Sequence, residues 1–346
     1  MSDWSTTITK NISFPLEVQQ SVKTPPLTTD QFNLAIEIMG FINLFLSLFG
    51  LCTNSVNLIV FSTIGISDNA TSMSFFALTT TDFIFLLLSI WHKLTIVLGY
   101  RLENFDYFVV TNLSLSYSMA PYTISTLITT YLAIQKCCCV ALPLHFKTTF
   151  TPFRTMVVIA TIVIVTVASY GPWFSGMTVS REQNSLTNST HLLAHLSDDW
   201  AALIQYSHGL FLIAFPTVTQ AVVTLCVIVL VIKLKDYSKF RQKIATNNQS
   251  NSNKDGELSG KDLKVAKSVT LVAAMFIISN LPFVMMTYTS LIDPEYSDYK
   301  QLSYVYTLLG IILIGLQIIC TSLNTFVYIG YNTAFRIQTK KLFYLK

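Results

Sequence analysis

Seven long stretches of this sequence are almost free of charged side chains, and no other feature constrains the fold as strongly. Six windows contain no Asp, Glu, Lys or Arg, and a seventh, 69–92, contains only Asp82. The six uncharged windows are 38–67, 107–135, 155–180, 200–232, 268–292 and 301–335. A helix needs about 20 largely apolar residues to cross a bilayer, and every window is at least that long. Because a soluble surface helix keeps a polar face, the windows predict seven transmembrane helices.

The expected fold is therefore an all-α membrane protein, a seven-transmembrane helix bundle with a short amphipathic C-terminal helix. We divide the chain into a polar N-terminal segment (1–33), the helical domain (34–330) and the tail helix (331–346). In the tail, apolar and basic side chains fall on opposite faces, which is typical of a helix lying on a membrane surface. An outer loop, 176–202, and an inner loop, 233–264, are the long connections, and the inner one contains a flexible polar linker. The spans are expected at 34–63, 73–95, 107–140, 154–175, 203–232, 265–290 and 302–330.

The composition excludes several classes of protein. Charged residues make up 12% of the chain, against about 25% in an ordinary soluble domain. A soluble enzyme, a disordered chain and a nucleic-acid-binding domain do not fit this pattern. An outer-membrane barrel would show short alternating segments instead of long apolar ones. All six cysteines lie in or beside predicted spans, so no structural disulfide is expected.

The distribution of charge predicts an N-terminus outside the cell. With that orientation, the cytosolic segments carry 16 basic and five acidic residues, and the outer segments carry six basic and 12 acidic ones. Basic residues are enriched on the cytosolic side of membrane proteins. Asn11 and Asn188 then lie outside in glycosylation sequons, which predicts a glycoprotein. We expect a multi-pass protein of the plasma membrane, surrounded by lipid.

Asp82 is the only carboxylate within a predicted span. A charge there costs about 2.5–3.5 kcal/mol on insertion scales, so by default such a residue is functional and faces the bundle interior. Its expected neighbours are the polar residues of other spans: Asn54, Ser125, Thr321 and Asn324. Two interpretations remain open: a hydrated pocket that binds a small cation such as Na⁺, chiefly through Asp82 and Ser125, or a neutral hydrogen-bonded network around a protonated carboxyl. No other cofactor is expected.

Polar side chains recur along the third predicted span at helical spacing. Ser118 and Lys136 are 18 residues apart, which is five whole turns, so they share one face of the helix. Tyr122, Ser125 and Thr129 lie between them on the same face. Such residues often hold transmembrane helices together. A stripe that crosses the whole membrane indicates instead a central helix, with a ligand at one end and a cytosolic partner at the other.

Seven short motifs, in the expected order and spacing, give the chain a resemblance to the rhodopsin-like (class A) family of G-protein-coupled receptors from residue 38 to residue 343. The motifs are Gly50-Leu-Cys-Thr-Asn54, Leu78-Thr-Thr-Thr-Asp82, Tyr131 to Leu144 with Pro143, Pro216, Phe276 to Pro282, Asn324-Thr-Phe-Val-Tyr328, and Phe335-Arg336. The run from Lys136 to Thr155 is similar to invertebrate receptors of the chemosensory and peptide types. The resemblance implies a plasma-membrane receptor and places Tyr328 in an activation network with the polar residues around Asp82.

The sequence also departs from the family pattern at several positions. The acid-arginine-aromatic triplet at the end of the third span is Gln135-Lys136-Cys137, and Asn280 replaces the sixth-span tryptophan. Lysine keeps the positive charge of arginine but loses its planar fork. The resemblance implies that Lys136, Pro143 and Asp262 contribute to G-protein coupling. We hypothesise that Lys136 and Asp262 form a cytoplasmic ion pair in the resting state; the alternative is that both point into water.

The resemblance also narrows the expected ligand. Ile318 occupies the position of the retinal lysine of visual pigments, and Ser118 occupies the position of the aspartate of amine receptors. Both of these ligand classes are therefore disfavoured. An outer cavity with aromatic walls and a few polar groups suits a small molecule or a peptide end. Its expected lining is His92, Tyr117, Ser118, Tyr122, His208, Asn280, Phe283 and Thr287.

Three functions from different classes follow from this sequence. The leading hypothesis is a receptor that binds an extracellular ligand, either a small chemical cue or a peptide, and activates a heterotrimeric G protein. The alternative is a membrane scaffold or chaperone that keeps the fold but has lost coupling through the Gln135-Lys136 change. A transporter or intramembrane enzyme is the third, and it lacks support because the spans carry no relay of ionisable groups.

Overall fold

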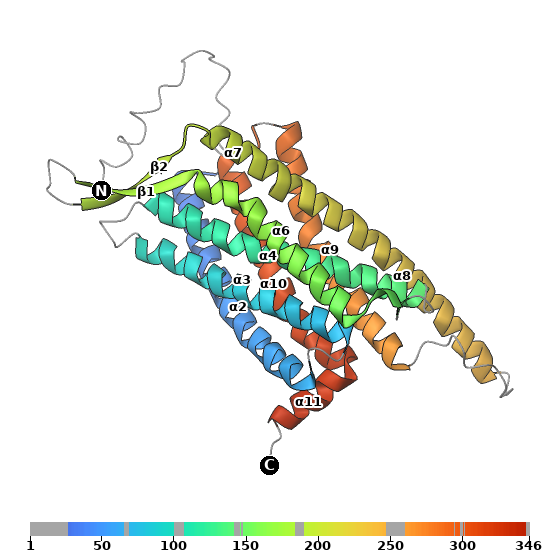
Figure 1. The fold of residues 1–346 in the computed structure, drawn as a ribbon. Coiled ribbons are helices and arrows are strands. Elements are labelled where there is room, and N and C mark those ends of the chain that lie inside the picture. The colour runs from blue at the N-terminus through green and yellow to red at the C-terminus, as the bar shows by residue number, and fades with distance from the viewer. Residues whose placement is uncertain are drawn as a thin grey trace.

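The computed structural model is a bundle of long helices (Figure 1). It describes residues 27–65, 69–99, 107–141, 146, 148–183, 190–246, 260–293, 295–297, 300 and 302–343. Within these ranges, seven helices are long and apolar enough to cross a membrane. The chain is therefore an all-α, multi-pass membrane protein with a seven-helix bundle and a short C-terminal helix, as the charge-free windows predicted.

Each predicted span corresponds to one long helix or to one continuous helical run. Five spans are α2 (Thr29–Ile64), α3 (Ala70–Gly99), α4 (Tyr107–Ala141), α6 (Pro152–Ser175) and α9 (Gly260–Ile292). The fifth span in chain order combines α7 (Trp200–Ser207), the π-helical turn η1 (His208–Ala214) and α8 (Phe215–Thr246). The last span is α10 (Ser303–Tyr331), and the tail helix α11 (Thr333–Phe343) follows it after a single residue.

The helix ends differ from the prediction because a charge-free window reports only the apolar part of a helix. It does not show capping residues or helical turns made of polar residues. The first helix begins at Thr29, ahead of the predicted residue 34, because Thr28 and Gln31 form a reciprocal capping box at its N-terminus. Helix α8 continues to Thr246, so part of the predicted inner loop is helical. The linker residues 247–259 lie outside the described residues.

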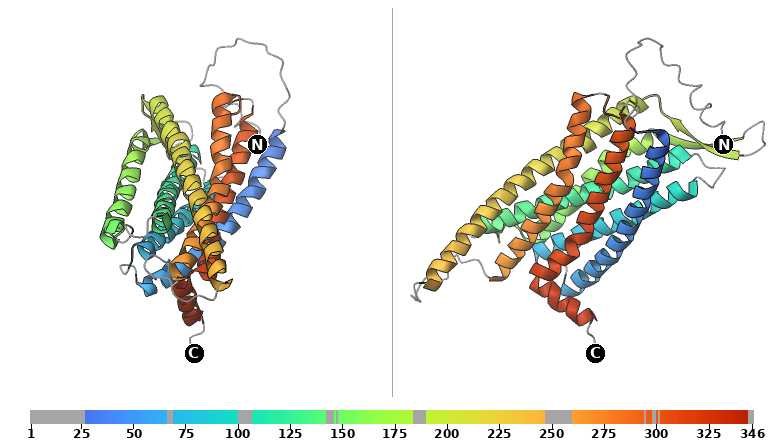
Figure 2. Two further views of the ribbon diagram at one scale, coloured as in Figure 1. Left: turned by 90° about the vertical axis from the view of Figure 1, so that its right-hand side faces the viewer. Right: turned by 180° about the vertical axis from the view of Figure 1, so that it is seen from behind.

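The predicted outer loop contains a β-hairpin that the sequence did not reveal. Strands β1 (Met177–Gln183) and β2 (Thr190–Leu196) pair antiparallel, with Met177 opposite Leu196 and Gln183 opposite Thr190. The hairpin and α7 lie at the end of the bundle opposite α11 (Figures 1 and 2).

Four aromatic rings form the centre of the packing at the α11 end. Phe61, Phe75, Tyr328 and Phe335 are each at most 2% exposed, and each pair among them except Phe75 and Phe335 has ring centroids 5.0–5.7 Å apart. They come from α2, α3, α10 and α11. Aromatic rings at such separations attract one another beyond the area they bury. This cluster fixes the tail helix to the bundle.

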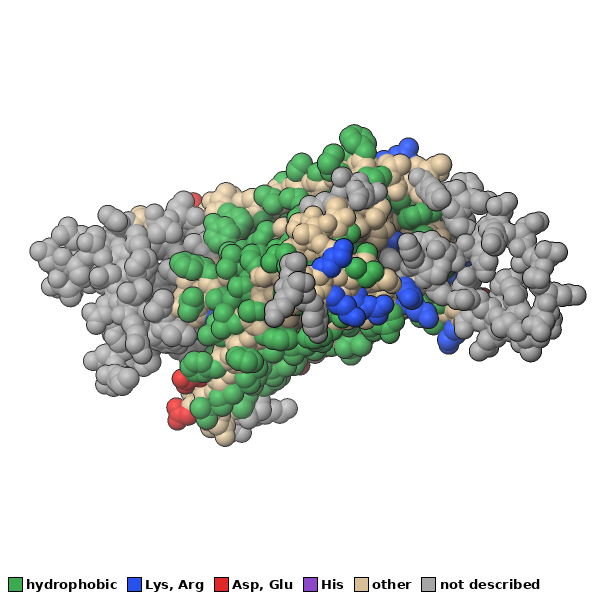
Figure 3. All heavy atoms as spheres, turned by 90° about the horizontal axis from the view of Figure 1, so that it is seen from below, with side chains coloured by type: hydrophobic (Ala, Val, Ile, Leu, Met, Phe, Trp, Pro, Cys, Tyr) green, Lys and Arg blue, Asp and Glu red, His purple; other side chains and the backbone are tan. Residues whose placement is uncertain are grey.

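The exterior of the bundle is apolar between two charged ends. Large hydrophobic side chains such as Phe45, Ile164 and Leu225 are more than 60% exposed on the sides of the helices. In Figure 3, hydrophobic side chains cover the body of the molecule, Lys and Arg gather toward one end, and Asp and Glu gather toward the other. An apolar belt between polar ends is the surface that a bilayer stabilises.

Candidate functional site

Asp82 joins three helices in the interior of the bundle. Its side chain is 1% exposed and lies on α3. Ser125 of α4 donates a hydrogen bond to one carboxylate oxygen at 2.5 Å, and Asn324 of α10 donates to the other at 3.0 Å. The sequence placed both of these residues beside Asp82, and the structure brings all three together. A buried carboxylate with donors on both oxygens is a polar centre that holds its helices in register.

A small cavity of about 30 Å³ adjoins this carboxylate, and Asp82, Ser125, Thr321 and Asn324 are among its lining residues. A cavity needs about 10–15 Å³ of such space to hold a water molecule, so this one is large enough for a water. Carboxylate, hydroxyl and carboxamide oxygens are the ligands that hard cations take in proteins. Because Ser125 donates its proton to Asp82, the lone pairs of its oxygen stay available. The residues present therefore fit a single small cation or a single water.

Two other residues of the predicted network lie outside this small cavity. Asn54 donates from its carboxamide to the carbonyls of Gly50 at 3.0 Å and Thr321 at 3.2 Å, so it connects α2 to α10. Tyr328 belongs to the aromatic cluster and is fully buried. Asn54 therefore contacts the backbone of Thr321, which itself lines the small cavity. Tyr328 lies between Asp82 and the tail helix.

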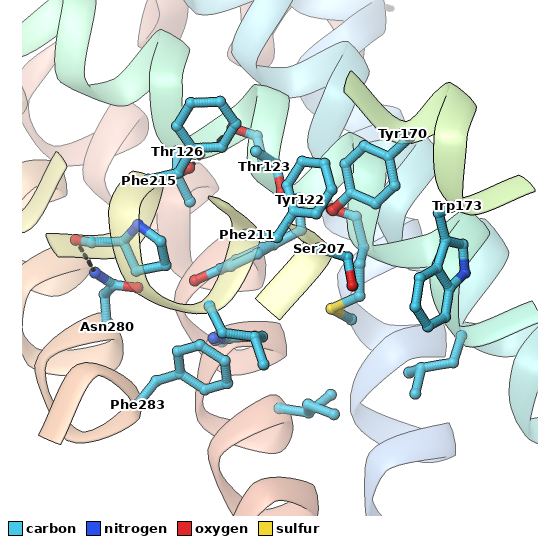
Figure 4. A pocket seen from close by; sticks show the side chains of 16 residues that line it. Tyr122, Thr123, Thr126, Tyr170, Trp173, Ser207, Phe211, Phe215, Asn280 and Phe283 are labelled. Atoms are coloured by element: carbon cyan, nitrogen blue, oxygen red, sulfur yellow. Dashed lines mark hydrogen bonds between the residues drawn. The ribbon is translucent and has the colours of Figure 1, made fainter. Parts of the chain in front are cut away.

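A larger cavity of about 310 Å³ opens between α4, α6, η1, α8, α9 and α10 (Figure 4). Six aromatic side chains form much of its wall: Tyr122, Tyr170, Trp173, Phe211, Phe215 and Phe283. Polar groups come from Thr123, Thr126, Ser207, Asn280 and Gln317. Pockets that bind small molecules have volumes of roughly 300–1,000 Å³ and a mainly apolar lining with a few polar groups. This cavity is at the small end of that range.

Three of the eight predicted ligand contacts line this cavity: Tyr122, Asn280 and Phe283. The amide nitrogen of Asn280 donates to Gln220 Oε1 at 3.1 Å and to the carbonyl of Pro216 at 3.4 Å. These bonds tie α9 to α8 beside the cavity. They use both donor hydrogens of the carboxamide and leave its oxygen as an acceptor.

Four of the remaining predicted contacts, His92, Tyr117, Ser118 and Thr287, are not among the residues that line this cavity. His92 bonds to Ser114 at 2.7 Å, and Ser118 donates to the carbonyl of Leu115 at 2.7 Å. Tyr117 is 51% exposed and stacks on Phe174, with ring centroids 4.5 Å apart. Thr287 donates to the carbonyl of Phe283 at 3.1 Å. The side chain of His208 lies outside the described residues.

The sequence missed the part of the wall that comes from α6 and η1. The π-helical turn spans His208–Ala214, and its residues Phe211 and Leu212 line the cavity together with Phe215. The ring of Phe211 stacks on Tyr170 with centroids 3.8 Å apart. Single π-turns within α-helices are rare and occur often at functional sites. Periodicity assumes a regular α-helix, so it could not place these side chains.

The predicted coupling and modification residues are only partly described. Lys136 is buried, its ammonium donates to the hydroxyl of Thr71, and it lies 5.6 Å from the centre of the Phe146 ring. The side chain of Asp262 and all of Pro143 are outside the described residues, so the proposed ion pair stays a prediction. Asn11 and Asn188 are also outside them.

Gln135, next to Lys136, is fully buried. Neither polar atom of its carboxamide has a hydrogen-bond partner among the described residues. An unpaired buried polar group costs about 1–3 kcal/mol, so this packing is unfavourable for the Gln135 carboxamide.

All six cysteines are free thiols. The described residues contain no group of three or more His, Cys, Asp or Glu side chains that could hold a metal ion. Comparison with known proteins adds no family, because no protein-family model and no curated protein matches this chain. The resemblance to the rhodopsin-like family therefore rests on the sequence motifs.

Proposed function

We propose that the protein is a plasma-membrane receptor that binds an extracellular ligand in the larger cavity and activates a heterotrimeric G protein at its basic end. The observation that carries the proposal is that the two cavities share part of their lining. Tyr122, Thr126 and Gln317 line both of them. A ligand that moves these shared walls changes the surroundings of Asp82, which links α3, α4 and α10.

The buried carboxamide of Gln135 supports a second packing of the bundle. Its unpaired polar atoms are a cost that disappears when the cytoplasmic end opens and water reaches them. Binding shifts a protein between two packings by the difference in the ligand's affinity for them. Opening at this end would uncover Lys136, where we place the contact with the G protein.

We further propose that the small cavity holds Na⁺ in the resting receptor. Asp82 and Ser125 would bind the ion, with Thr321 and Asn324 nearby. The ion would supply a positive charge that balances the buried carboxylate and so stabilises the resting packing. The ligand and the ion would then favour different packings.

The function is tested by reporter cells that carry each class of Gα subunit. The wild type should raise the signal of at least one class when peptide and odorant libraries are applied. Lys136→Met should remove this signal at equal surface expression. Lys340→Met is the matched control, because Lys340 is an exposed basic residue in the last turn of α11, and it should signal normally.

A wild type that stays silent in every class contradicts the receptor proposal. In that case the double variant Gln135→Asp and Lys136→Arg decides between the remaining functions. Coupling that appears only in the double variant supports the scaffold or chaperone hypothesis, because it shows that the fold is intact and that only the coupling residues are lost.

A further inference from the structure

The larger cavity has no charged side chain among the described residues that line it. His92 and Lys93 are buried on α3 but do not contribute to its lining, and Asp82 lines only the small cavity. A charged ligand group buried in this cavity would lose its hydration without gaining an ionic partner. That loss is far more costly than burying a neutral polar group that finds a hydrogen bond.

The walls of the cavity favour a flat ring system. Phe211 and Tyr170 stack at 3.8 Å between ring centroids, and the hydroxyl of Tyr170 is 3.1 Å from that of Thr123. These contacts hold the rings on the α6 and η1 side in fixed positions. Aromatic surfaces bind another ring by offset stacking or edge contacts without requiring charge.

Gln317 brings an uncharged polar side chain to the larger cavity. It is 2% exposed, it lies on α10, and it lines both cavities. Its carboxamide makes no hydrogen bond to any described residue. Three other buried carboxamides of the bundle are bonded: Asn54 to backbone carbonyls, Asn280 to Gln220, and Asn324 to Asp82. The carboxamide of Gln135 is also unpaired among the described residues, but it does not line this cavity.

An unpaired carboxamide in a cavity has two donor hydrogens and an acceptor oxygen to offer to a bound molecule. The oxygen of Asn280 adds a second acceptor on the α9 side of the same cavity, because the nitrogen of that amide is already bonded. The cavity therefore offers both kinds of hydrogen-bonding group and no charge.

We propose that the ligand is an uncharged small molecule with an aromatic ring system and a carboxamide-like polar group, and that Gln317 is the residue that selects this group. The proposal rests on the proposed function, because it names the class of ligand that would bind in the same cavity. It disfavours a peptide terminus, which carries a charge. Of the two ligand types expected from the sequence, the small chemical cue remains.

Four indole compounds that share one ring system test the ligand class. Indole-3-acetamide is neutral and has the polar group, 3-methylindole is neutral without it, tryptamine is a cation, and indole-3-acetate is an anion at pH 7. Radiolabelled indole-3-acetamide should bind saturably to membranes that contain the full-length protein, and the other three should compete less well than the unlabelled amide. No saturable binding of the amide, or better competition by either ion, overturns the proposal.

Substitution of Gln317 tests its role. Gln317→Leu should weaken binding of the amide about tenfold, which is the value of one or two hydrogen bonds, and should leave binding of 3-methylindole unchanged. The 3-methylindole result shows that the cavity is still folded. Gln317→Glu should make tryptamine the preferred compound, because it introduces the missing counter-charge. If Gln317→Leu weakened the binding of both neutral compounds equally, the role of Gln317 would be to pack the cavity wall. That result would contradict the proposed recognition.

These binding measurements require no G protein. A protein that binds the amide but activates no Gα class contradicts the proposed coupling and leaves the ligand class intact. A protein that signals but prefers tryptamine contradicts the ligand class and leaves the receptor function intact.

Discussion

At the scale of the residue, two buried polar side chains with different hydrogen-bonding patterns define the interior. Asp82 accepts from Ser125 and Asn324, whereas the carboxamide of Gln317 is unpaired among the described residues. Asp82 was visible in the sequence because a single charge in a long apolar window carries a large insertion cost. Gln317 was not, because a neutral amide in an uncharged window leaves no comparable signal.

The carboxylate of Asp82 should make thermal stability depend on Na⁺. Replacing Na⁺ by choline at constant ionic strength should lower the melting temperature of the purified wild type. An ion present at ten times its dissociation constant stabilises the folded state by about 1.4 kcal/mol. Asp82→Asn removes the charge that holds the ion, so its melting temperature should be the same in both salts.

Asp30→Asn is the matched control, because Asp30 is an exposed carboxylate in the first turn of α2. It should respond to Na⁺ as the wild type does. A sodium effect of equal size in Asp82→Asn would place the ion elsewhere.

At the scale of the element, α2 packs against α3 and α10 through a close approach at Gly50. A Cβ atom there would meet the Ser322 hydroxyl inside van der Waals contact and would lie 3.0 Å and 3.1 Å from the two methyl groups of Leu86. Two hydrogen bonds, each 3.1 Å long, hold α2 against α10: Thr53 donates to the Ser322 carbonyl, and Asn43 donates to the Ile311 carbonyl. Small residues at such contacts let transmembrane helices approach closely.

Gly50→Ala should therefore destabilise the bundle by about 1–3 kcal/mol, the usual cost of overpacking. Gly40→Ala is the control on the same helix, because a Cβ atom there meets nothing within 4 Å. It should be neutral or stabilising by up to about 1 kcal/mol, since alanine is the better helix former. Thermal unfolding in one detergent measures both variants. If Gly50→Ala melts at or above Gly40→Ala, α2 packs more loosely than this contact requires.

The positions of the spanning helices followed from the sequence, but their ends and local geometry did not. Seven apolar windows located seven helices because a long apolar segment that crosses a membrane satisfies its backbone hydrogen bonds within one helix. The capping box at Thr28, the helical extension of α8 to Thr246 and the hairpin of β1 and β2 depend on local hydrogen bonds at the membrane boundary. The π-turn η1 carries Phe211, whose ring stacks on Tyr170 of α6.

At the scale of the whole molecule, the charged ends of the bundle predict its orientation. An epitope tag at the N-terminus should be stained on intact cells, and a tag at the C-terminus should be stained only after permeabilisation. The physical reason is the excess of basic residues in the segments that we assign to the cytosol. Staining of the C-terminal tag on intact cells would reverse the orientation and, with it, the assignment of the ligand and G-protein ends.

The sequence by itself determined the membrane environment and the number of spans, and it predicted the orientation of the charged ends. Each of these properties depends on the transfer of long segments between water and lipid, which is additive along the chain. It also singled out Asp82, and it named three of the residues that line the larger cavity.

Only the tertiary structure decided which uncharged side chains share a cavity. Phe211, Tyr170 and Gln317 lie on three different helical elements, and they line one cavity because the bundle packs η1, α6 and α10 around it. The shape of the cavity, and which of its polar groups stay unpaired, depend on how several helices pack together. No property of one segment predicts them.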